Sequence, residues 1–371
     1  MQRFIANALA GLAVSGLALL GSGLAQAQTK ISFGGAMPTT EANSRANLLF
    51  FKRVEEASKG KLKFEATFDG QIVNFRSTLG GVKDGLVDAA QLFPAFFFSE
   101  LKTMSMFVQL GGQPPDAWVG AAAMNETVLL NCPECEAELA RYKIKGFAIS
   151  GSAPFYLLLR SPINDLADLK GKNIRGVGPS QVLIQALGAN PAATAPSEVF
   201  EAMQRGQIEG AVAGVDWLKQ YGLSDVVKYV VEPPTGHDFA GRMPFVTSVD
   251  LWKRLSPDQK EAILRNLPFL IAEATANGVA DGMEARRLGE SKGVRFSKTP
   301  AAYGEKLDAF RTSEIERVVT TYKKQGVERA DVLVKIFLEK VAKWQKIAAE
   351  TKGDRKAYEE ALWQEIFSKL K

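Results

Sequence analysis

Two cysteines have a spacing that suggests chemistry. Cys132 and Cys135 form a C-x-x-C pair in the stretch NCPECEAEL, and they are the only cysteines of the chain. In an oxidising compartment such a pair closes a small structural disulfide, whereas in a thioredoxin-like unit it forms a redox couple. Glu134 and Glu136 lie on either side of Cys135 and would raise the pKa of a thiolate. We therefore expect a structural disulfide, with free or redox-active thiols as the alternative.

The single histidine, His237, lies in the turn-rich stretch PPTGHDFAG. A metal site built from cysteine and histidine needs more ligands than this chain supplies. A Ser-His-Asp or Cys-His mechanism would depend on His237 alone. We predict that His237 is a loop residue, and we expect no metal, cofactor or catalytic residue.

One arginine, Arg175, follows a short apolar approach in DLKGKNIRGVG and precedes Gly176, Val177 and Gly178. An arginine at the end of a buried strand is costly unless a negative group meets it. That group is either an internal Asp or Glu or the carboxylate of a ligand. From the residues alone, internal pairing is the preferred interpretation, because most partly buried arginines are paired.

The composition is that of an ordinary globular protein, and the chain is long enough for two lobes. The chain has 371 residues, of which 46% are hydrophobic and 23% are charged. Its pI is about 9.0, but basic and acidic side chains are interleaved along the sequence. The charge therefore indicates a solvated surface and no nucleic-acid partner.

The first 27 residues have the pattern of a secretory signal peptide. Arg3 supplies a positive start, an apolar stretch follows, and Ala25-Gln26-Ala27 is a small-x-small cleavage site. A membrane anchor is the alternative, although glycines and serines interrupt the apolar stretch. We expect cleavage after Ala27 and a soluble protein exported to the periplasm.

The elements that must position these side chains belong to the α/β class. Residues 30–33 and 62–68 are predicted strands, and a helix is expected from about Ser44 to Lys59-Gly60. Strand, helix, strand indicates a parallel pair within a sheet.

Two later stretches resemble one another. Residues 78–90 and 199–211 each give a short amphipathic helix, a glycine stop at Gly85 or Gly206, and a buried strand. This similarity suggests two related lobes with mixed sheets and flanking helices, and a ligand cleft between them. Chance similarity is the alternative, because corners made of a helix, a glycine and a strand are common in α/β folds.

The domain boundaries follow from two apolar crossing segments, 146–159 and 239–248. We expect a first lobe from 28–152 plus about 245–305, and a second lobe from 153–244. Residues 306–371 are rich in Lys, Glu, Ala and Leu at helical spacing. We expect this C-terminal region to be helical and to pack across the lobes.

Several motifs, in order along the chain, carry a family resemblance. KISFGGAMP opens the chain after the leader, DLKGKNIR and LGANP follow in the middle, and PSEVFEAMQRGQIEG and WKRLSPDQKEAI come later. From about Lys30 to Ala349 the chain resembles the solute-binding proteins of tripartite ATP-independent periplasmic (TRAP) transporters. The resemblance implies a two-lobe fold of the Venus-flytrap type that binds an organic acid between its lobes.

The resemblance implies that the protein is a receptor and not an enzyme. Its partners would be the organic acid and the small and large membrane subunits of a TRAP permease. In most members an arginine after the D-L-K-G motif pairs with the ligand carboxylate, and the matching residue here is Arg175. Two alternatives stay open: a periplasmic thiol-redox protein using Cys132 and Cys135, and a ligand-sensing subunit of a signalling system.

Further candidates for the ligand site lie near expected strand ends and crossings. Trp217 either covers the ligand or belongs to the core, and Arg242 is either a second anion contact or a surface charge. Phe97 and Phe98 are expected in the core. The candidates other than Arg175 are Met37 with its neighbours Ala36 and Pro38, Phe93, Phe96, Phe155, Tyr156, Asp216 and Trp217.

The chain departs from the sugar-acid-binding members of the family in two places. It has no basic residue in GSAPFY, where they carry another arginine, and GAVAG stands where they carry an asparagine. These departures favour a less polar monocarboxylate, such as a keto acid, an aromatic acid or a short hydroxy acid.

Overall fold

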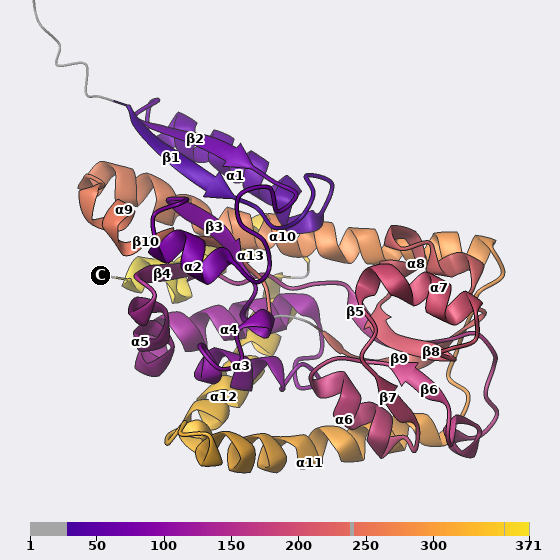
Figure 1. Ribbon diagram of the computed structural model, residues 1–371. Coiled ribbons are helices and arrows are strands. Elements are labelled where there is room, and N and C mark those ends of the chain that lie inside the picture. Colours follow the sequence, from indigo (N-terminus) through magenta and orange to yellow (C-terminus); the bar gives the residue numbers. More distant parts are fainter. Residues whose placement is uncertain (1–27, 238–240, 352, 371) are drawn as a thin grey trace, which may run out of the picture.

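The structure, a computed structural model, describes residues 28–237, 241–351 and 353–370. The expected signal peptide, 1–27, lies outside the described residues. Two sheets form the centres of two lobes (Figure 1). The first sheet has the order β2-β1-β3-β10-β4, with β1 (Thr29–Gly34), β2 (Leu62–Thr67), β3 (Ala89–Leu92), β4 (Ile144–Ala148) and β10 (Met243–Ser248). The second has the order β11-β9-β5-β8-β6-β7, with β5 (Pro154–Leu159), β6 (Asn173–Arg175), β7 (Asn190–Ala192), β8 (Gly210–Gly214), β9 (Tyr229–His237) and β11 (Arg295–Ser297).

The two lobes share one strand topology. In the first, β1 pairs in parallel with β2 and β3, and in the second β6 pairs in parallel with β7 and β8. Each sheet then receives an antiparallel strand from a segment that has crossed between the lobes: β10 beside β3, and β5 beside β8. This common order confirms the α/β fold with two similar lobes that the sequence predicted.

The two similar sequence corners are structurally equivalent. Helices α2 (Thr78–Lys83) and α7 (Val199–Gln204) are followed by Gly85 and Gly206, whose φ angles of 77° and 73° lie in the left-handed region. The backbone N–H groups of Asp88 and Glu209 then donate to the carbonyls of Ser32 in β1 and Asn173 in β6, at 3.0 and 2.8 Å. The chain enters a fully buried strand directly afterwards in both lobes.

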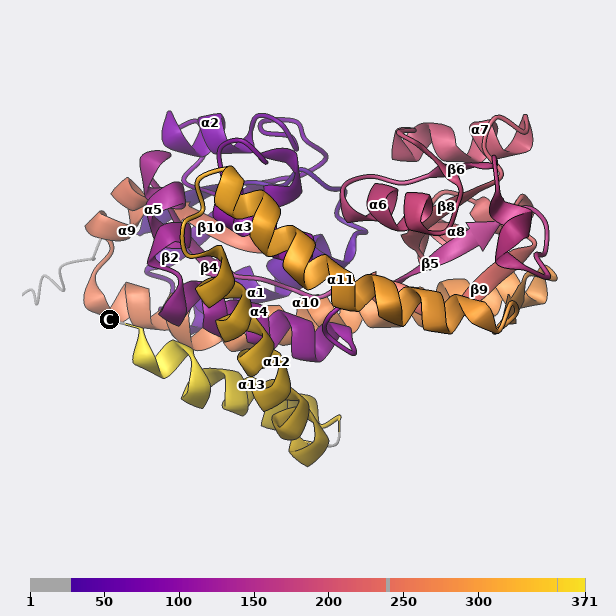
Figure 2. The same ribbon diagram turned by 90° about the horizontal axis from the view of Figure 1, so that it is seen from below.

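Long helices join the lobes. Helix α10 (Pro257–Ser291) has 35 residues, begins with a capping box of Ser256 and Gln259, and packs on α1 (Ala42–Ala57) of the first lobe and α8 (Trp217–Gln220) of the second. Helix α11 (Ala302–Lys324) also runs from the second lobe to the first, whereas α12 (Ala330–Thr351) and α13 (Arg355–Glu365) lie beside the first lobe (Figure 2). The remaining helices are α3 (Lys102–Val108), α4 (Ala117–Asn131), α5 (Pro133–Arg141), α6 (Pro179–Ala186) and α9 (Val249–Arg254).

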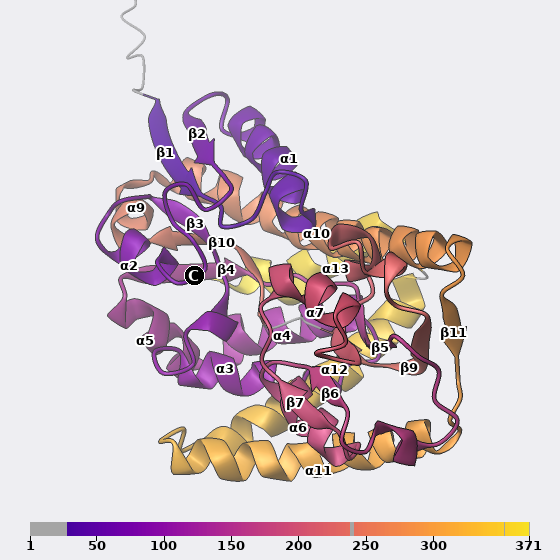
Figure 3. The same cartoon turned by 45° about the vertical axis from the view of Figure 1, so that its right-hand side comes forward.

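Two domain expectations need correction. β11, which was expected in the first lobe, pairs with β9 at the edge of the second sheet (Figure 3). Of the C-terminal helices only α11 crosses between the lobes, because α12 and α13 bury their apolar faces against α4 and α10. The continuous helix α10 carries the chain from the first lobe to the second before β11, and no pattern in the sequence indicates that one helix packs on both lobes.

The segment that crosses from β4 to β5 lies directly on α10. A Cβ atom added at Gly282 would lie 2.9 Å from Ala153 Cβ, and one added at Gly278 would lie 3.3 Å from Ser152 Cα. Glycine at these two positions therefore permits close contact between the helix and the crossing segment. Among the described residues no helix is long and apolar enough to cross a bilayer.

Candidate functional site

An open cleft of about 1330 Å³ lies between the lobes. Its walls are the segments that follow equivalent strands: β1 and β3 in the first lobe, and β6 and β8 in the second. Ligands of α/β sheets bind outside the carboxyl ends of the strands. The residues brought together there include nine of the sequence candidates, namely Ala36, Met37, Pro38, Phe93, Phe96, Phe155, Arg175, Asp216 and Trp217.

Arg175 is the last residue of β6 and only 5% of it is exposed. Its Nε donates to the Thr194 carbonyl at 3.1 Å. Among the described residues, no carboxylate lies within ion-pair distance of its guanidinium. Burial lowers the pKa of Arg175 to about 10, which leaves the side chain protonated at neutral pH. The internal ion pair that the residues alone favoured is therefore absent from the described part of the chain.

Two aromatic rings lie beside Arg175. The Trp217 ring centre is 4.8 Å from the guanidinium carbon and 4.7 Å from the Tyr221 ring centre. Both rings line the cleft, so Trp217 is a wall residue and not a core residue. Tyr221 is not among the candidates predicted from the sequence, although it follows Trp217 by one helical turn and would share its face.

Asp216 is half-buried in the cleft wall and packs against β8. A Cβ atom at Gly214 would lie 2.2 Å from Asp216 Oδ1, so only glycine permits this position of the carboxylate. Burial raises the pKa of Asp216, while the positive charge of Arg242 opposes that shift.

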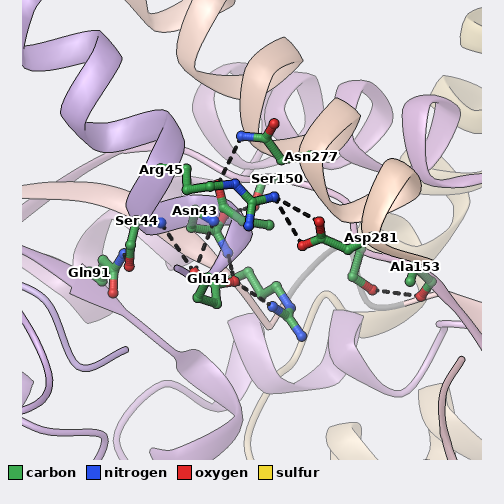
Figure 4. A network of polar contacts seen from close by, with 12 residues as sticks. Glu41, Asn43, Ser44, Arg45, Gln91, Ser150, Ala153, Asn277 and Asp281 are labelled. Carbon is green, nitrogen blue, oxygen red and sulfur yellow. Dashed lines mark hydrogen bonds and ion pairs between the residues drawn. The ribbon is translucent and has the colours of Figure 1, made fainter. Parts of the chain in front are cut away.

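Arg242, for which the sequence left two roles open, has a carboxylate partner inside the cleft. Its guanidinium donates to Glu41 Oε1 at 3.1 Å. Glu41 also caps α1 by accepting from the backbone N–H groups of Asn43 and Ser44 (Figure 4). Arg242 therefore lies at the cleft and is already paired with an anion of the protein, Glu41. Next to it, Arg45 of α1 makes two hydrogen bonds to Asp281 of α10, at 2.8 and 3.0 Å (Figure 4).

The first-lobe wall is apolar. Phe93 is buried and Met37 is half-buried, whereas Phe96 is 47% exposed in the cleft. Phe97 packs in the core as expected, but Phe98 is 41% exposed and lines the cleft, so its core assignment was wrong. A run of phenylalanines cannot show from sequence alone which members turn outward after the strand has ended.

Tyr156 does not line the cleft, unlike its neighbour Phe155. Successive side chains of a strand point to opposite faces of the sheet. Tyr156 lies in the core of the second lobe, with its ring centre 6.2 Å from that of Phe296. We therefore leave Tyr156 out of the proposed site.

His237 was predicted to be a loop residue, but it ends strand β9 and lines the cleft. Its backbone N–H donates to the Gly111 carbonyl at 2.9 Å. Burial lowers the pKa of His237, and its Nδ1 is buried without a hydrogen-bond partner among the described residues. Pro233 and Pro234, which precede it within β9, argue against a strand in a sequence-based prediction, so the strand was not predicted.

Cys132 and Cys135 are joined by a disulfide. Cys132 stands at the start of α5, and both residues are buried in the core of the first lobe. Neither lines the cleft. This pairing agrees with the expected structural disulfide and contradicts the alternative of free thiols.

Comparisons with known proteins agree with this architecture. A solute-binding protein of Roseobacter denitrificans is 28% identical over 164 residues, which are 43% of this chain and about half, 47%, of the length of that relative. Two solved TRAP solute-binding proteins have the same fold. One, from Rhodoferax ferrireducens with copurified benzoate, has a TM-score of 0.72 at 18% identity over 86% of this chain and 100% of its own. The other, from Pseudomonas putida with bound D-glucuronate, has a TM-score of 0.62 at 21% identity over 83% of this chain and 96% of its own.

A family model covers most of the described chain. The model of the bacterial extracellular solute-binding proteins, family 7, matches residues 33–299, which include the second sheet, most of the first sheet and helix α10. This family consists of solute receptors and is not a class of enzymes. The chain belongs to the bacterial extracellular solute-binding proteins of family 7.

Proposed function

We propose that the protein is an extracytoplasmic receptor for a small organic acid, which it binds between its lobes and delivers to a TRAP-type secondary transporter. The small and large membrane subunits of that permease are its proposed partners, and the periplasm is its proposed location. The ligand carboxylate pairs with Arg175, while Trp217, Asp216, Phe155, Phe93, Phe96 and Met37 surround the rest of the molecule.

One observation carries this proposal: a buried arginine faces the cleft without a carboxylate partner among the described residues. Leaving a buried charge unpaired costs free energy, so a ligand that supplies a negative charge next to Arg175 is stabilised by that pairing. Guanidinium and carboxylate also match through two parallel hydrogen bonds. The Thr194 carbonyl already occupies Nε, which leaves the two terminal nitrogens for the ligand.

The two solved relatives described above support the ligand class and nothing narrower. Benzoate and D-glucuronate share a carboxylate and differ in almost everything else. Their common group is the one that Arg175 would bind. The lobes would close because only the closed form lets both walls contact the same molecule.

A ligand screen tests this proposal directly. The full chain is expressed, purified from the periplasmic fraction, and tested by thermal shift against organic acids and neutral sugars. An acid present at about 100 times its Kd should stabilise the fold by about 2.7 kcal/mol. A set of hits confined to neutral solutes would contradict the proposal.

A further inference from the structure

Three phenylalanines form a continuous aromatic surface on the first-lobe side of the cleft. The Phe75 ring centre lies 4.9 Å from that of Phe93, edge to face, and 4.9 Å from that of Phe96, stacked. All three rings line the cleft. We call Phe75, Phe93 and Phe96 the phenylalanine shelf.

The shelf is not fully covered by the protein. Phe96 is 47% exposed, and the only other phenylalanine with a largely exposed side chain among the described residues is Phe98, which lines the same cleft. Val177, in the opposite lobe just after Arg175, is 49% exposed at the cleft as well. Exposed apolar groups on both walls of one cleft mark a site that is completed by an apolar partner.

The shared topology of the lobes shows what the first lobe places opposite Arg175. Arg175 pairs with Ala211 of β8, and the equivalent position in the first sheet is Gly34, which pairs with Ala90 of β3. No charge stands there: a Cβ atom at Gly34 would lie 2.4 Å from the Val73 side chain. The first lobe therefore has apolar packing where the second lobe has its cation.

The aromatic residues occupy equivalent places too. Phe96 comes eight residues after Asp88 and Trp217 comes eight residues after Glu209, and these two acidic residues hold the same position in the two corners. One lobe thus presents Arg175 with Trp217, and the other presents a glycine with Phe96. The cleft has one cationic half and one aromatic half.

Most other cations of the cleft are already engaged, among them Lys219, which pairs with Glu284. Arg242 pairs with Glu41, Arg45 with Asp281 and Arg311 with Asp308. A second carboxylate on the ligand would have to displace one of these pairs or reach the exposed side chain of Arg76 at the first-lobe side of the cleft. A ligand rich in hydroxyl groups would have to lose water against the shelf without gaining hydrogen-bond partners there.

From these relationships we infer that the ligand is an aromatic monocarboxylate, with its carboxylate on Arg175 and its ring against the phenylalanine shelf. This inference rests on the proposed function, since it names the acid class that the same cleft takes. Ring–ring contacts in offset or edge-to-face geometry add affinity beyond the burial of apolar area.

The test uses matched acids and a variant that spares the fold. Phenylacetate, cyclohexylacetate, lactate and D-glucuronate are titrated by calorimetry into the full chain and into Phe96→Ala. Phenylacetate should bind at least about 10-fold more tightly than lactate or glucuronate. Phe96→Ala should weaken phenylacetate by about 3- to 10-fold and leave lactate unchanged. Leu86→Ala, which removes a 60% exposed side chain of the same lobe outside the cleft, is the matched control.

Each contrary outcome has a distinct meaning. If glucuronate or lactate binds most tightly and Arg175→Ala abolishes that binding, the aromatic inference is overturned while the proposed receptor function stands. If cyclohexylacetate equals phenylacetate in every variant, an apolar body suffices and the aromatic requirement is wrong. If no carboxylate binds to the wild-type chain, the proposed function fails with it.

Discussion

The guanidinium carbon of Arg175 lies 4.8 Å from the centre of the Trp217 ring, at the carboxyl end of the second sheet. The ring partly covers the guanidinium, and the Thr194 carbonyl accepts from Nε. The two terminal nitrogens are therefore the part of Arg175 that remains for an anion. An aromatic neighbour also restricts the rotamers of the arginine, so less entropy is lost when an acid binds.

Replacing Arg175 should affect binding far more than folding. Arg175→Ala is expected to weaken acid binding by about 2–5 kcal/mol, the usual effect of removing one member of a buried charge pair. Arg175→Lys should lose much of the same affinity, because an ammonium group cannot make two parallel hydrogen bonds. Titration calorimetry with the best acid from the screen measures both losses.

Arg205→Ala supplies the matched control, since it removes the same charge from an exposed position of the second lobe. Arg205 pairs with Glu201 at 3.0 Å and both side chains are about two-thirds exposed. Its replacement should leave affinity unchanged. If Arg175→Ala binds like wild type, the arginine serves the structure alone.

Gly282 and Gly304, two glycines in helices, should respond in opposite ways to replacement by alanine. Gly282 packs against the crossing segment, whereas Gly304 has open space beside it. At Gly282 a Cβ atom would lie 2.9 Å from Ala153 Cβ and 3.1 Å from Val215, so Gly282→Ala should destabilise the fold by about 1–3 kcal/mol. At Gly304 of α11 the nearest atom would be 4.0 Å away, so Gly304→Ala should gain up to about 1 kcal/mol of helix propensity. Urea unfolding of both variants gives the comparison, and a Gly282→Ala protein as stable as wild type would contradict close packing at the crossing.

The sequence predicted the parts of the fold that depend on local pattern. The α/β class, the strand at 62–68 and the left-handed glycines Gly85 and Gly206 all follow from periodicity and turn chemistry, and the structure contains them. Helical spacing alone would place Leu49 of α1 on the inward face, yet Leu49 is 46% exposed, because the buried stripe of α1 is narrower than the apolar one.

The parts that were missed depend on contacts between distant segments. Arg175 could be singled out by its type and position, but the place of Tyr156 on the other face required the pairing of β5 with its neighbours. The outward turn of Phe98 and the edge strand β11 also depend on long-range packing. Such contacts leave no periodic trace in a single sequence.

A buried carboxylate should make stability depend on acidity. Glu126 of α4 is 3% exposed; burial would raise its pKa, but hydrogen bonds from Lys340, Lys343 and Trp344 outweigh burial and lower it below the ordinary value of 4.5. The folded state then binds fewer protons than the unfolded state, so this stabilisation is present above about pH 4.5 and is lost as the pH falls through the lower folded pKa.

Glu126→Gln should therefore be less stable than wild type at pH 7, by about 1–3 kcal/mol, and the difference should shrink below pH 4.5. Urea unfolding at several pH values provides the measurement. Glu339→Gln, which alters a largely exposed carboxylate on α12, is the control. A constant gap between Glu126→Gln and wild type across the acid range would refute the role of this carboxylate in the pH dependence.

The disulfide between Cys132 and Cys135 should support the fold and leave ligand binding alone. Its removal in Cys132→Ser/Cys135→Ser should lower stability by about 2 kcal/mol, the scale for a very short loop, and leave acid affinity at the wild-type value. Thermal unfolding and calorimetry measure the two effects. Loss of binding on reduction, with the fold intact, would favour the thiol-redox alternative.

Helix α10 packs against the cores of both lobes without interruption over 35 residues. If one lobe unfolds, it exposes a part of α10 whose remaining length packs on the other lobe. The two lobes should therefore unfold together, as one cooperative unit. An acid held at the second-lobe end should consequently slow proteolysis in α12, which packs mainly on α4 of the first lobe. Binding of an acid in the cleft would thus raise the resistance to unfolding of the whole chain, and not of the cleft alone.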